Sequence, residues 1–416
     1  MAPLEASSSP SQEHQPALDK HEAWPDPEEE GKDGNYRGYT MDVTASAVEE
    51  MQVGEENVQW AYRLIQLLDA DTRLFLADGL LRKVEAFVAT GTGPLSQWAR
   101  RVMVIPENAK RLAELRRRVE VCRQAARDMR SDDWHLAHTE DGIETFSRKD
   151  EGDNTLAWRT HGEIEDCPVV SQLAVLREPD HYHRWIPLMD KSKVVKRLGK
   201  IEQMVWFRVA GTGIPFVRDA VLHLYGCDAS EENLIILSGA SMPESEITDE
   251  MDVRPPKKKW NHARVDIKYF SIQLKILSPT HCKIDLIYKL DVKLTLVPQA
   301  IINYFSKFTC GWVIWFLFQE MRRIQTDPVH NPTAQLMRSD PFYANYLVPY
   351  CLHLAHTKGW AVPDVPAFEV DRDCTTAKAW RQEHHELLAK NRLLSGGGGE
   401  GGSGGEERGG GGQEGK

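Results

Sequence analysis

Arg218, Asp219 and His223 are the polar side chains best placed in the sequence to act together. A histidine transfers protons near neutral pH, and an arginine beside a carboxylate can anchor the polar end of a bound molecule. The simpler interpretation of Arg218 and Asp219 is an ion pair that holds the end of a strand. No segment resembles the strand-turn-helix setting of a nucleophilic serine, so no catalytic residues are predicted.

Two other motifs contain residue types that bind metals or phosphates. His181, Tyr182 and His183 supply two imidazoles, but no third or fourth ligand is placed to complete a site, which favours a surface loop. Two Gly-Thr-Gly segments, at 91–93 and 211–213, lack the longer glycine pattern of phosphate-binding loops. The sequence therefore predicts no metal and no cofactor.

Residues 298–324 are the stretch around which the chain is organised, and their pattern predicts one long helix. Pro298 suits the first turn, and Arg322 and Arg323 place positive charge in the last turn. At ~1.5 Å per residue the helix would be about 40 Å long. Its apolar residues recur with the spacing of one broad face, which needs a large apolar partner: Ala300, Ile301, Tyr304, Phe305, Phe308, Trp312, Trp315, Phe316 and Phe318.

Strand patterns fill the chain before this helix. Residues 284–296 alternate apolar and polar side chains, which is typical of an antiparallel sheet with one buried face. A hairpin is predicted at 134–146 around an Asp-Gly turn, and the alternation of 265–277 changes phase near Phe270, which indicates a bulge. Further strands are expected at 156–164, 193–197, 203–209, 220–225 and 233–238, with a helix at 168–177 capped by Asp166. The predicted fold class is α+β, with the long helix laid across one curved antiparallel sheet.

The rest of the chain divides into four parts. Residues 1–54 and 395–416 are rich in residues that build no core, so both are predicted to be disordered tails. Residues 55–130 have helical spacing and form a helical region before the main domain at 131–328. Residues 329–394 form a C-terminal extension with two expected helices, at 342–357 and 377–394.

The third expected helix of the helical region, at 107–130, carries eight arginines and lysines. The simpler interpretation is a solvated face on a small helical bundle. The alternative is attraction to an anionic membrane or an acidic partner. The glutamates on the same helix weaken this alternative.

Composition limits the function classes. The chain has 416 residues, a formal net charge of −11 and a pI of about 5.8, so it has no nucleic-acid footprint. Its seven cysteines are scattered without a paired spacing, which indicates free thiols in a reducing compartment. No secretory signal or membrane-spanning segment is predicted. We therefore expect a cytoplasmic protein.

A series of motifs resembles the steroidogenic-acute-regulatory-protein-related lipid transfer (START) family. Trp134 with the sequence GIETF at 142–146 is similar to that family's opening hairpin, and HRWIP at 183–187 to its Trp-x-Pro segment. PFVRD at 215–219 is similar to its Pro-Arg-Asp motif, and VPQAIIN at 297–303 to the entry of its C-terminal helix. The resemblance implies a helix-grip fold, in which a curved antiparallel sheet and the long helix enclose a lipid-sized tunnel.

The resemblance also implies which residues meet a ligand. Sterol-carrying members place an acidic residue and an arginine inside the tunnel, at positions that align with 205–207 and with Leu224, and neither is charged here. A more apolar tunnel is therefore expected. The candidate lipid-binding residues are Trp206, Arg218, Asp219, Leu224, Tyr288, Phe305, Phe308, Trp312, Trp315 and Phe316. Lys257, Lys258, Lys259 and Trp260 are candidates for contact with an anionic membrane, with a solvated loop as the alternative.

The expected function is binding of a phospholipid, sterol or other apolar ligand, with transfer between membranes or sensing, through transient contact with a membrane surface. One alternative is an enzyme of the cyclase or hydratase kind, acting on an apolar substrate in the same tunnel. Another is a lipid-sensing scaffold whose residues 55–130 bind a protein partner.

Overall fold

The computed structural model describes residues 40–41, 43–149, 156–210, 217–248, 251, 253, 262–291, 299–364 and 382. Side chains are described for all of these except 290–291 and 299–308. The proposed membrane contact at 257–260, the helix expected at 377–394 (but for residue 382) and most of both predicted tails lie outside the described residues.

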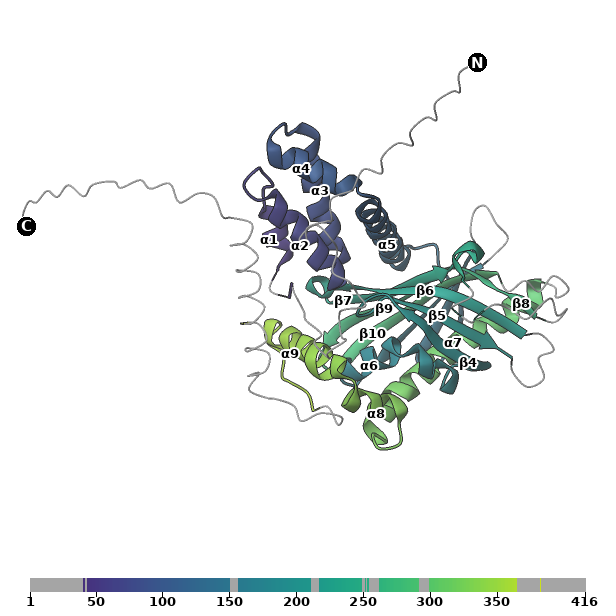
Figure 1. Ribbon diagram of the computed structural model, residues 1–416. Coiled ribbons are helices and arrows are strands. Elements are labelled where there is room, and N and C mark those ends of the chain that lie inside the picture. The colour runs from purple at the N-terminus through teal and green to yellow at the C-terminus, as the bar shows by residue number, and fades with distance from the viewer. Residues whose placement is uncertain are drawn as a thin grey trace, which may run out of the picture.

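Helices form the first part of the described chain and pack together as a bundle (Figure 1). They are α1 (Ala45–Glu50), α2 (Val58–Ala70), α3 (Leu74–Thr90), α4 (Pro94–Val104) and α5 (Pro106–Arg130). The Gly-Thr-Gly segment at 91–93 separates α3, which ends at Thr90, from α4, which begins with Pro94 in its first turn. The helical region predicted from the apolar spacing is therefore observed. It contains one further helix, α4, that the spacing did not predict.

Helix α1 lies inside the segment that composition predicts to be disordered, so that boundary is wrong. The side chain of Thr44 caps α1 by accepting a hydrogen bond from the Ala47 N–H, and Val48 is buried in the bundle. Before it, Thr40 donates from its backbone and its hydroxyl to Asp71, at 2.7 and 2.8 Å. Composition misses this segment because its order comes from a cap and from tertiary contacts.

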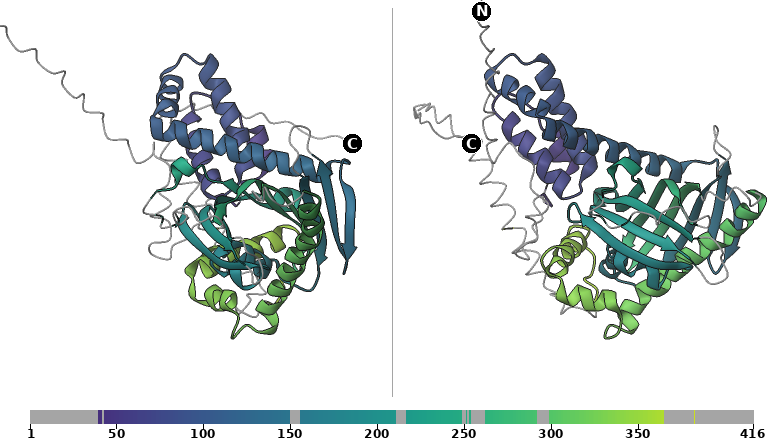
Figure 2. Two further views of the ribbon diagram at one scale, coloured as in Figure 1. Left: turned by 90° about the vertical axis from the view of Figure 1, so that its right-hand side faces the viewer. Right: turned by 45° about the vertical axis from the view of Figure 1, so that its right-hand side comes forward.

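Ten strands form one sheet, in the order β1-β2-β3-β10-β9-β7-β6-β5-β4, with β8 beside β6. All neighbours are antiparallel except β6 and β8. Figure 2 shows that the sheet is strongly curved. The strands are β1 (His135–Glu140), β2 (Ile143–Lys149), β3 (Leu156–Ile164), β4 (Met189–Arg197), β5 (Gln203–Val209), β6 (Val217–Ala229), β7 (Leu234–Ser241), β8 (His262–Arg264), β9 (Asp266–Ser278) and β10 (His281–Asp291).

The strand pattern follows the sequence closely. The β1–β2 turn has the positive φ angles that an Asp-Gly turn needs, 51° at Asp141 and 76° at Gly142. The predicted bulge is present in β9, because the register shifts where Lys289 pairs with Tyr269 and Leu290 with Ile267. Asp166 does not cap the next helix, since Pro168 is the residue before α6 (Val169–Arg177).

Helix α7 (Gln299–Thr326) lies along the open side of the curved sheet, against β1, β2 and β3 (Figure 2). Gly162 on β3 allows this close approach, because a Cβ atom there would lie 3.0 Å from the Phe318 ring. The chain then continues into α8 (Pro332–Ser339), a π-helical turn (Tyr343–Leu347) and α9 (Val348–Thr357). Among the described residues, no helix is long and apolar enough to cross a membrane.

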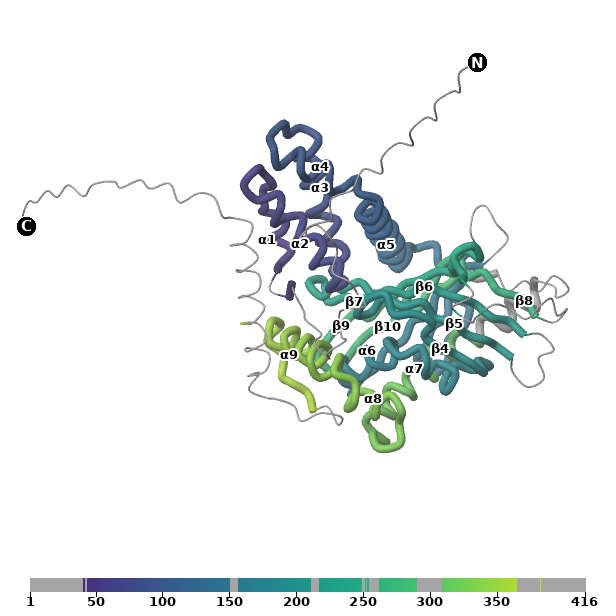
Figure 3. The backbone as a smooth tube through the Cα atoms, viewed as in Figure 1, coloured from purple at the N-terminus to yellow at the C-terminus, as the bar shows by residue number. Residues whose placement is uncertain are grey.

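The sheet has an apolar core on each face. On one face, α6 to α9 cover side chains such as Ile164, Leu274 and Ile284. On the other face, the helical bundle covers Tyr225, Cys227 and Ile236. The predicted α+β helix-grip architecture is therefore confirmed, and the helical region packs directly on the outer face of the grip (Figure 3).

Candidate functional site

An apolar cavity of about 120 Å³ lies between the sheet and α7. Strands β5, β6, β9 and β10 direct some of their alternating side chains into it, and α7 supplies Val313, Ile314 and Leu317. All described lining residues are apolar or aromatic: Leu176, Tyr182, Trp185, Ile186, Met189, Val205, Phe207, Leu222, Leu224, Ile267, Phe270, Ile272, Leu286, Val313, Ile314 and Leu317.

Of the positions that align with the charged residues of sterol carriers, Val205, Phe207 and Leu224 lie in this cavity wall, whereas Trp206 does not. Val205 pairs with Leu222 across β5 and β6, and Phe207 and Leu224 face the same space. Val205 and Leu224 are both buried. The expectation of a more apolar lining at these positions agrees with the structure.

Tyr182 and Trp185 form the wall next to β4. Their rings meet edge to face with centroids 5.3 Å apart, and the Tyr182 hydroxyl donates to the Leu176 carbonyl at 2.5 Å. Burial raises the pKa of Tyr182, so the phenol stays neutral. Trp185 belongs to the Trp-x-Pro motif, which was the sequence signal for this wall. Tyr182 was assigned to a surface loop instead, and its burial in a 3-10 helix (Pro179–Arg184) corrects that assignment.

The two histidines beside Tyr182 have different hydrogen-bond partners. His181 Nδ1 lies 2.9 Å from the Thr333 hydroxyl, and burial lowers the pKa of His181. His183 Nδ1 lies 3.0 Å from the Ser192 hydroxyl instead. The two imidazoles therefore bind different partners.

The tryptophans predicted to line the tunnel lie on another side of α7. Trp312 and Trp315 are 50% and 38% exposed, and with Phe316 they line a separate, open groove. The predicted inward face of α7 is wrong at these positions. The physical reason is that residues 311–318 are apolar all round, so the helical period does not identify which side packs on the sheet.

The other candidates on the strands divide between the two faces of the sheet. Tyr288 faces α7, where its hydroxyl contacts the Cys310 thiol, and burial raises the pKa of Tyr288 well above its usual value. Arg218 is in phase with Ala220 and Leu222, so it points to the cavity side at the start of β6. The side chains of Phe305 and Phe308 lie outside the described residues.

Trp206 and Asp219 face away from the cavity. The Trp206 indole N–H donates to Asp219 at 3.0 Å, and Arg264 pairs with the same carboxylate at 2.7 Å. His223 is on that outer face too, where its Nε2 lies 2.9 Å from Glu202. Arg218, Asp219 and His223 therefore do not converge on one site.

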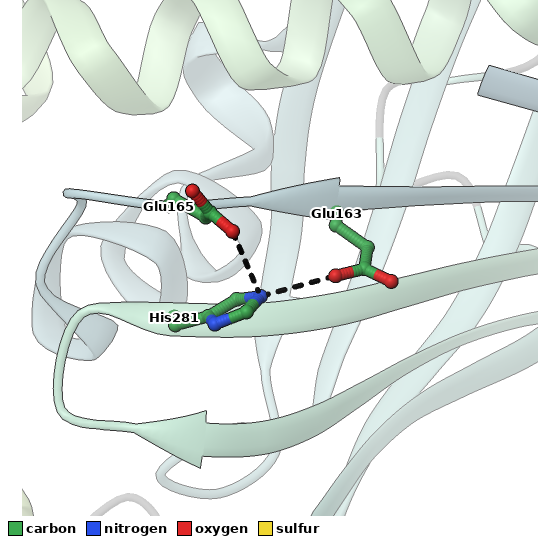
Figure 4. A group of neighbouring side chains, drawn as sticks. All are labelled: Glu163, Glu165 and His281. Atoms are coloured by element: carbon green, nitrogen blue, oxygen red, sulfur yellow. Dashed lines mark hydrogen bonds and ion pairs between the residues drawn. The ribbon is translucent and has the colours of Figure 1, made fainter. Parts of the chain in front are cut away.

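The described residues contain a group of potential metal ligands that no sequence motif indicated. Glu163, Glu165 and His281 bring their ligand atoms within 4.8 Å of one another on the outer face of β3 and β10 (Figure 4). The second oxygen of Glu163 forms an ion pair with Lys283 at 2.5 Å, and the two carboxylates are exposed. A divalent cation would bind beside an ammonium group, so the group is best explained as a cross-strand ion-pair cluster.

No family model matches this chain, and no curated protein matches it. Solved structures similar to part of it include human StAR-related lipid transfer protein 5, with 13% identity over 50% of this chain and 95% of that chain, at a TM-score of 0.42. A StAR-related lipid transfer protein fragment from Xanthomonas axonopodis has 20% identity over 46% and 99%, at 0.37. The Zhui aromatase/cyclase from a Streptomyces species has 9% identity over 41% and 94%, at 0.27.

The fold implied by the motifs can be compared with the architecture directly. The curved antiparallel sheet, the final strand β10 and the long helix α7 are the parts that a helix-grip fold requires. The domain from β1 to α7 is therefore START-like in fold.

Proposed function

We propose that the domain from β1 to α7 binds a lipid or another hydrophobic ligand in the cavity between α7 and the sheet. The observation that carries this proposal is the cavity wall, in which no described lining residue is charged. Transfer of apolar ligand surface from water to such a wall is favourable by about 25 cal/mol per Å². Binding then needs no covalent chemistry.

The size of the cavity sets a condition on this function. The volume of the cavity is about 120 Å³. Pockets for larger ligands measure about 300–1,000 Å³. A bound lipid must therefore widen the cavity, which requires α7 or the neighbouring loops to move away from the sheet.

Exchange of the ligand would take place at a membrane surface, where the exposed apolar part of the lipid never enters water. The protein would then act in the cytoplasm, in transient contact with membranes, and either transfer or sense the lipid. Whether residues 257–260 make that contact stays a prediction.

The enzyme alternative relied on Arg218, Asp219 and His223, and these three side chains do not lie together in the cavity. Arg218 points to the cavity side. On the outer face, Asp219 pairs with Arg264 and His223 pairs with Glu202. An enzyme of the cyclase or hydratase kind would have to use other groups. The scaffold alternative would need a partner for the surface of the bundle that faces away from the sheet.

The proposal is tested by what the purified protein carries. We expect organic extraction and mass spectrometry to recover lipid in a fixed ratio to protein, and the protein to move a labelled lipid between vesicles. Val313→Trp, which fills the cavity, should lower both. Arg322→Trp places the same side chain on the exposed side of α7 and serves as the control. A protein that carries no lipid and transfers none would contradict the proposal, as would equal lipid content in the two variants.

A further inference from the structure

A second cavity, which we call the aromatic groove, opens beside α7 and has a volume of about 480 Å³. This is within the range of about 300–1,000 Å³ that is usual for ligand pockets. Its described lining residues are His138, Glu140, Asp141, Ile143, Thr145, Pro187, Gly311, Trp312, Trp315 and Phe316. None of them lines the apolar cavity under α7, so the two are separate sites.

The aromatic side chains of the groove are unusually exposed. Trp312 and Trp315 are 50% and 38% exposed, although tryptophan buries the largest apolar area of any side chain. The rings of Trp315 and Phe316 are 4.8 Å apart at 87°, so they stand as two adjoining walls at a right angle. Exposed rings held in this way are available to a ligand.

Negative charge borders the same groove. Glu140 and Asp141 are exposed carboxylates at the β1–β2 turn, whose backbone is fixed by the left-handed angles of Asp141 and Gly142. His138 lies 3.3 Å from Glu140. No lysine or arginine occurs among the described lining residues. The groove therefore combines aromatic faces with a net negative rim.

We propose that the aromatic groove binds an organic cation of the quaternary ammonium class. Such a cation is attracted to the electron-rich faces of tryptophan and to carboxylates at close range. It carries no N–H donors, so the indole walls leave none of its groups without a hydrogen-bond partner. An ammonium or guanidinium ion could donate to the carboxylates on one side, but it would lose water from the donors that face the indole rings.

This inference does not depend on the proposed lipid cavity, because the groove has its own walls and its own charges. Two sources would present the same chemistry. One is a small free cation such as choline, and the other is the choline headgroup of a lipid in a bilayer.

Titration calorimetry of the full chain at constant ionic strength tests the proposal. We expect saturable binding of tetramethylammonium and choline, and at least tenfold weaker binding of ammonium and of 3,3-dimethyl-1-butanol, the uncharged carbon analogue of choline. Trp312→Ala and Trp315→Ala should each weaken choline binding about tenfold. Glu140→Gln combined with Asp141→Asn should weaken choline but leave the carbon analogue unchanged. Glu165→Gln removes an exposed carboxylate elsewhere and should change neither.

Vesicles distinguish the two sources. If the headgroup is the ligand, phosphatidylcholine vesicles bind and free choline competes, whereas phosphatidylglycerol vesicles do not bind. If the free cation is the ligand, choline binds and vesicles have no effect. The proposal is overturned if no methylated cation binds saturably, if the carbon analogue binds as well as choline, or if folded Trp312→Ala and Trp315→Ala variants bind choline unchanged.

Discussion

Asp219 is buried on the outer face of the sheet, where it holds Trp206 and Arg264 together. The sequence suggested an ion pair with the adjacent Arg218 at a strand end. An ion pair at Asp219 is present, but its partner is Arg264 on β8, because successive side chains of β6 point to opposite faces. Asp219 thus secures β8 to β6 and is separated from any ligand under α7 by the sheet.

This role makes a clear prediction for Asp219→Ala. The change removes the buried carboxylate that accepts from Trp206 and pairs with the largely buried Arg264, and loss of one partner of such a pair typically costs about 3–5 kcal/mol of unfolding free energy. Urea unfolding measures that loss. The control is Asp190→Ala, which removes the partly exposed pair with Arg208 and should cost under about 1 kcal/mol. Equal losses in the two variants would show that the Asp219 cluster is not a stabilising element.

At the scale of the element, α7 presents different sides to different surroundings. Cys310, Ile314, Leu317, Met321 and Ile324 are buried toward the sheet and its helices. Trp312 and Trp315 face the aromatic groove and solvent. The helix therefore serves both as a core element and as the wall between two cavities.

The two sides should respond differently to truncation. Ile314→Ala removes a fully buried side chain beside Gly162, and we expect it to lower the unfolding free energy by about 2–5 kcal/mol. Trp315→Ala removes a larger but partly exposed side chain and should cost less, about 1–2 kcal/mol. Denaturant melts of both variants compare the two, and a greater loss for Trp315→Ala would mean that the orientation of α7 is wrong.

The contact between α7 and β3 gives a second prediction at this scale. In Gly162→Ala the new Cβ atom would lie 3.0 Å from the Phe318 ring and 3.3 Å from Ile314, so these two side chains must give way, at a cost of about 1–3 kcal/mol. Gly311→Ala is the matched change on α7 itself, where the nearest atom is 3.6 Å away. Because alanine favours a helix over glycine by about 1 kcal/mol, this variant should melt at or above the wild-type temperature. A Gly162→Ala protein as stable as wild type would exclude the close approach.

At the scale of the molecule, a buried charge network joins the bundle to the sheet. Arg118 of α5 is 1% exposed and lies 2.5 Å from Asp69 of α2 and 3.1 Å from Glu202 beside β5. Glu202 also accepts from His223 at 2.9 Å. Of the two interpretations of the basic helix, neither a solvated face nor a membrane surface describes Arg118. This part of α5 is an internal interface, so the helical region and the grip domain should unfold together.

The network makes the stability depend on acid. Burial acts to raise the pKa of Glu202, but the hydrogen bond from His223 and the charges of Arg118 and Arg111 outweigh it and lower that pKa from its usual 4.5 to about 2. Because the folded state binds this proton less readily than the unfolded state, the Glu202 contribution is present above about pH 4.5 and is lost between there and pH 2. Unfolding free energies measured over this range should therefore fall less steeply for Glu202→Gln. Parallel pH profiles for the two proteins would contradict the assignment.

Most of the fold could be predicted from the sequence because its signals are local. Alternation along 284–296, of which the structure describes 284–291, depends only on nearby residues, as do the Asp-Gly turn at 141–142 and the long apolar run before Thr326. These signals led to the observed sheet and helix. Leu224 is buried in the cavity wall, and its role in lipid binding stays a prediction.

Tertiary structure alone decided which faces meet. A helix that is apolar on all sides does not specify which side binds the sheet, so the groove of Trp312 and Trp315 could not be foreseen. Asp219 pairs with Arg264, 45 positions away, and Arg118 pairs with Glu202, 84 positions away. The spacing of residues in the sequence does not predict pairs that are so far apart along the chain. Local chemistry thus determined the elements, whereas their packing determined the two cavities and the charge network between bundle and sheet.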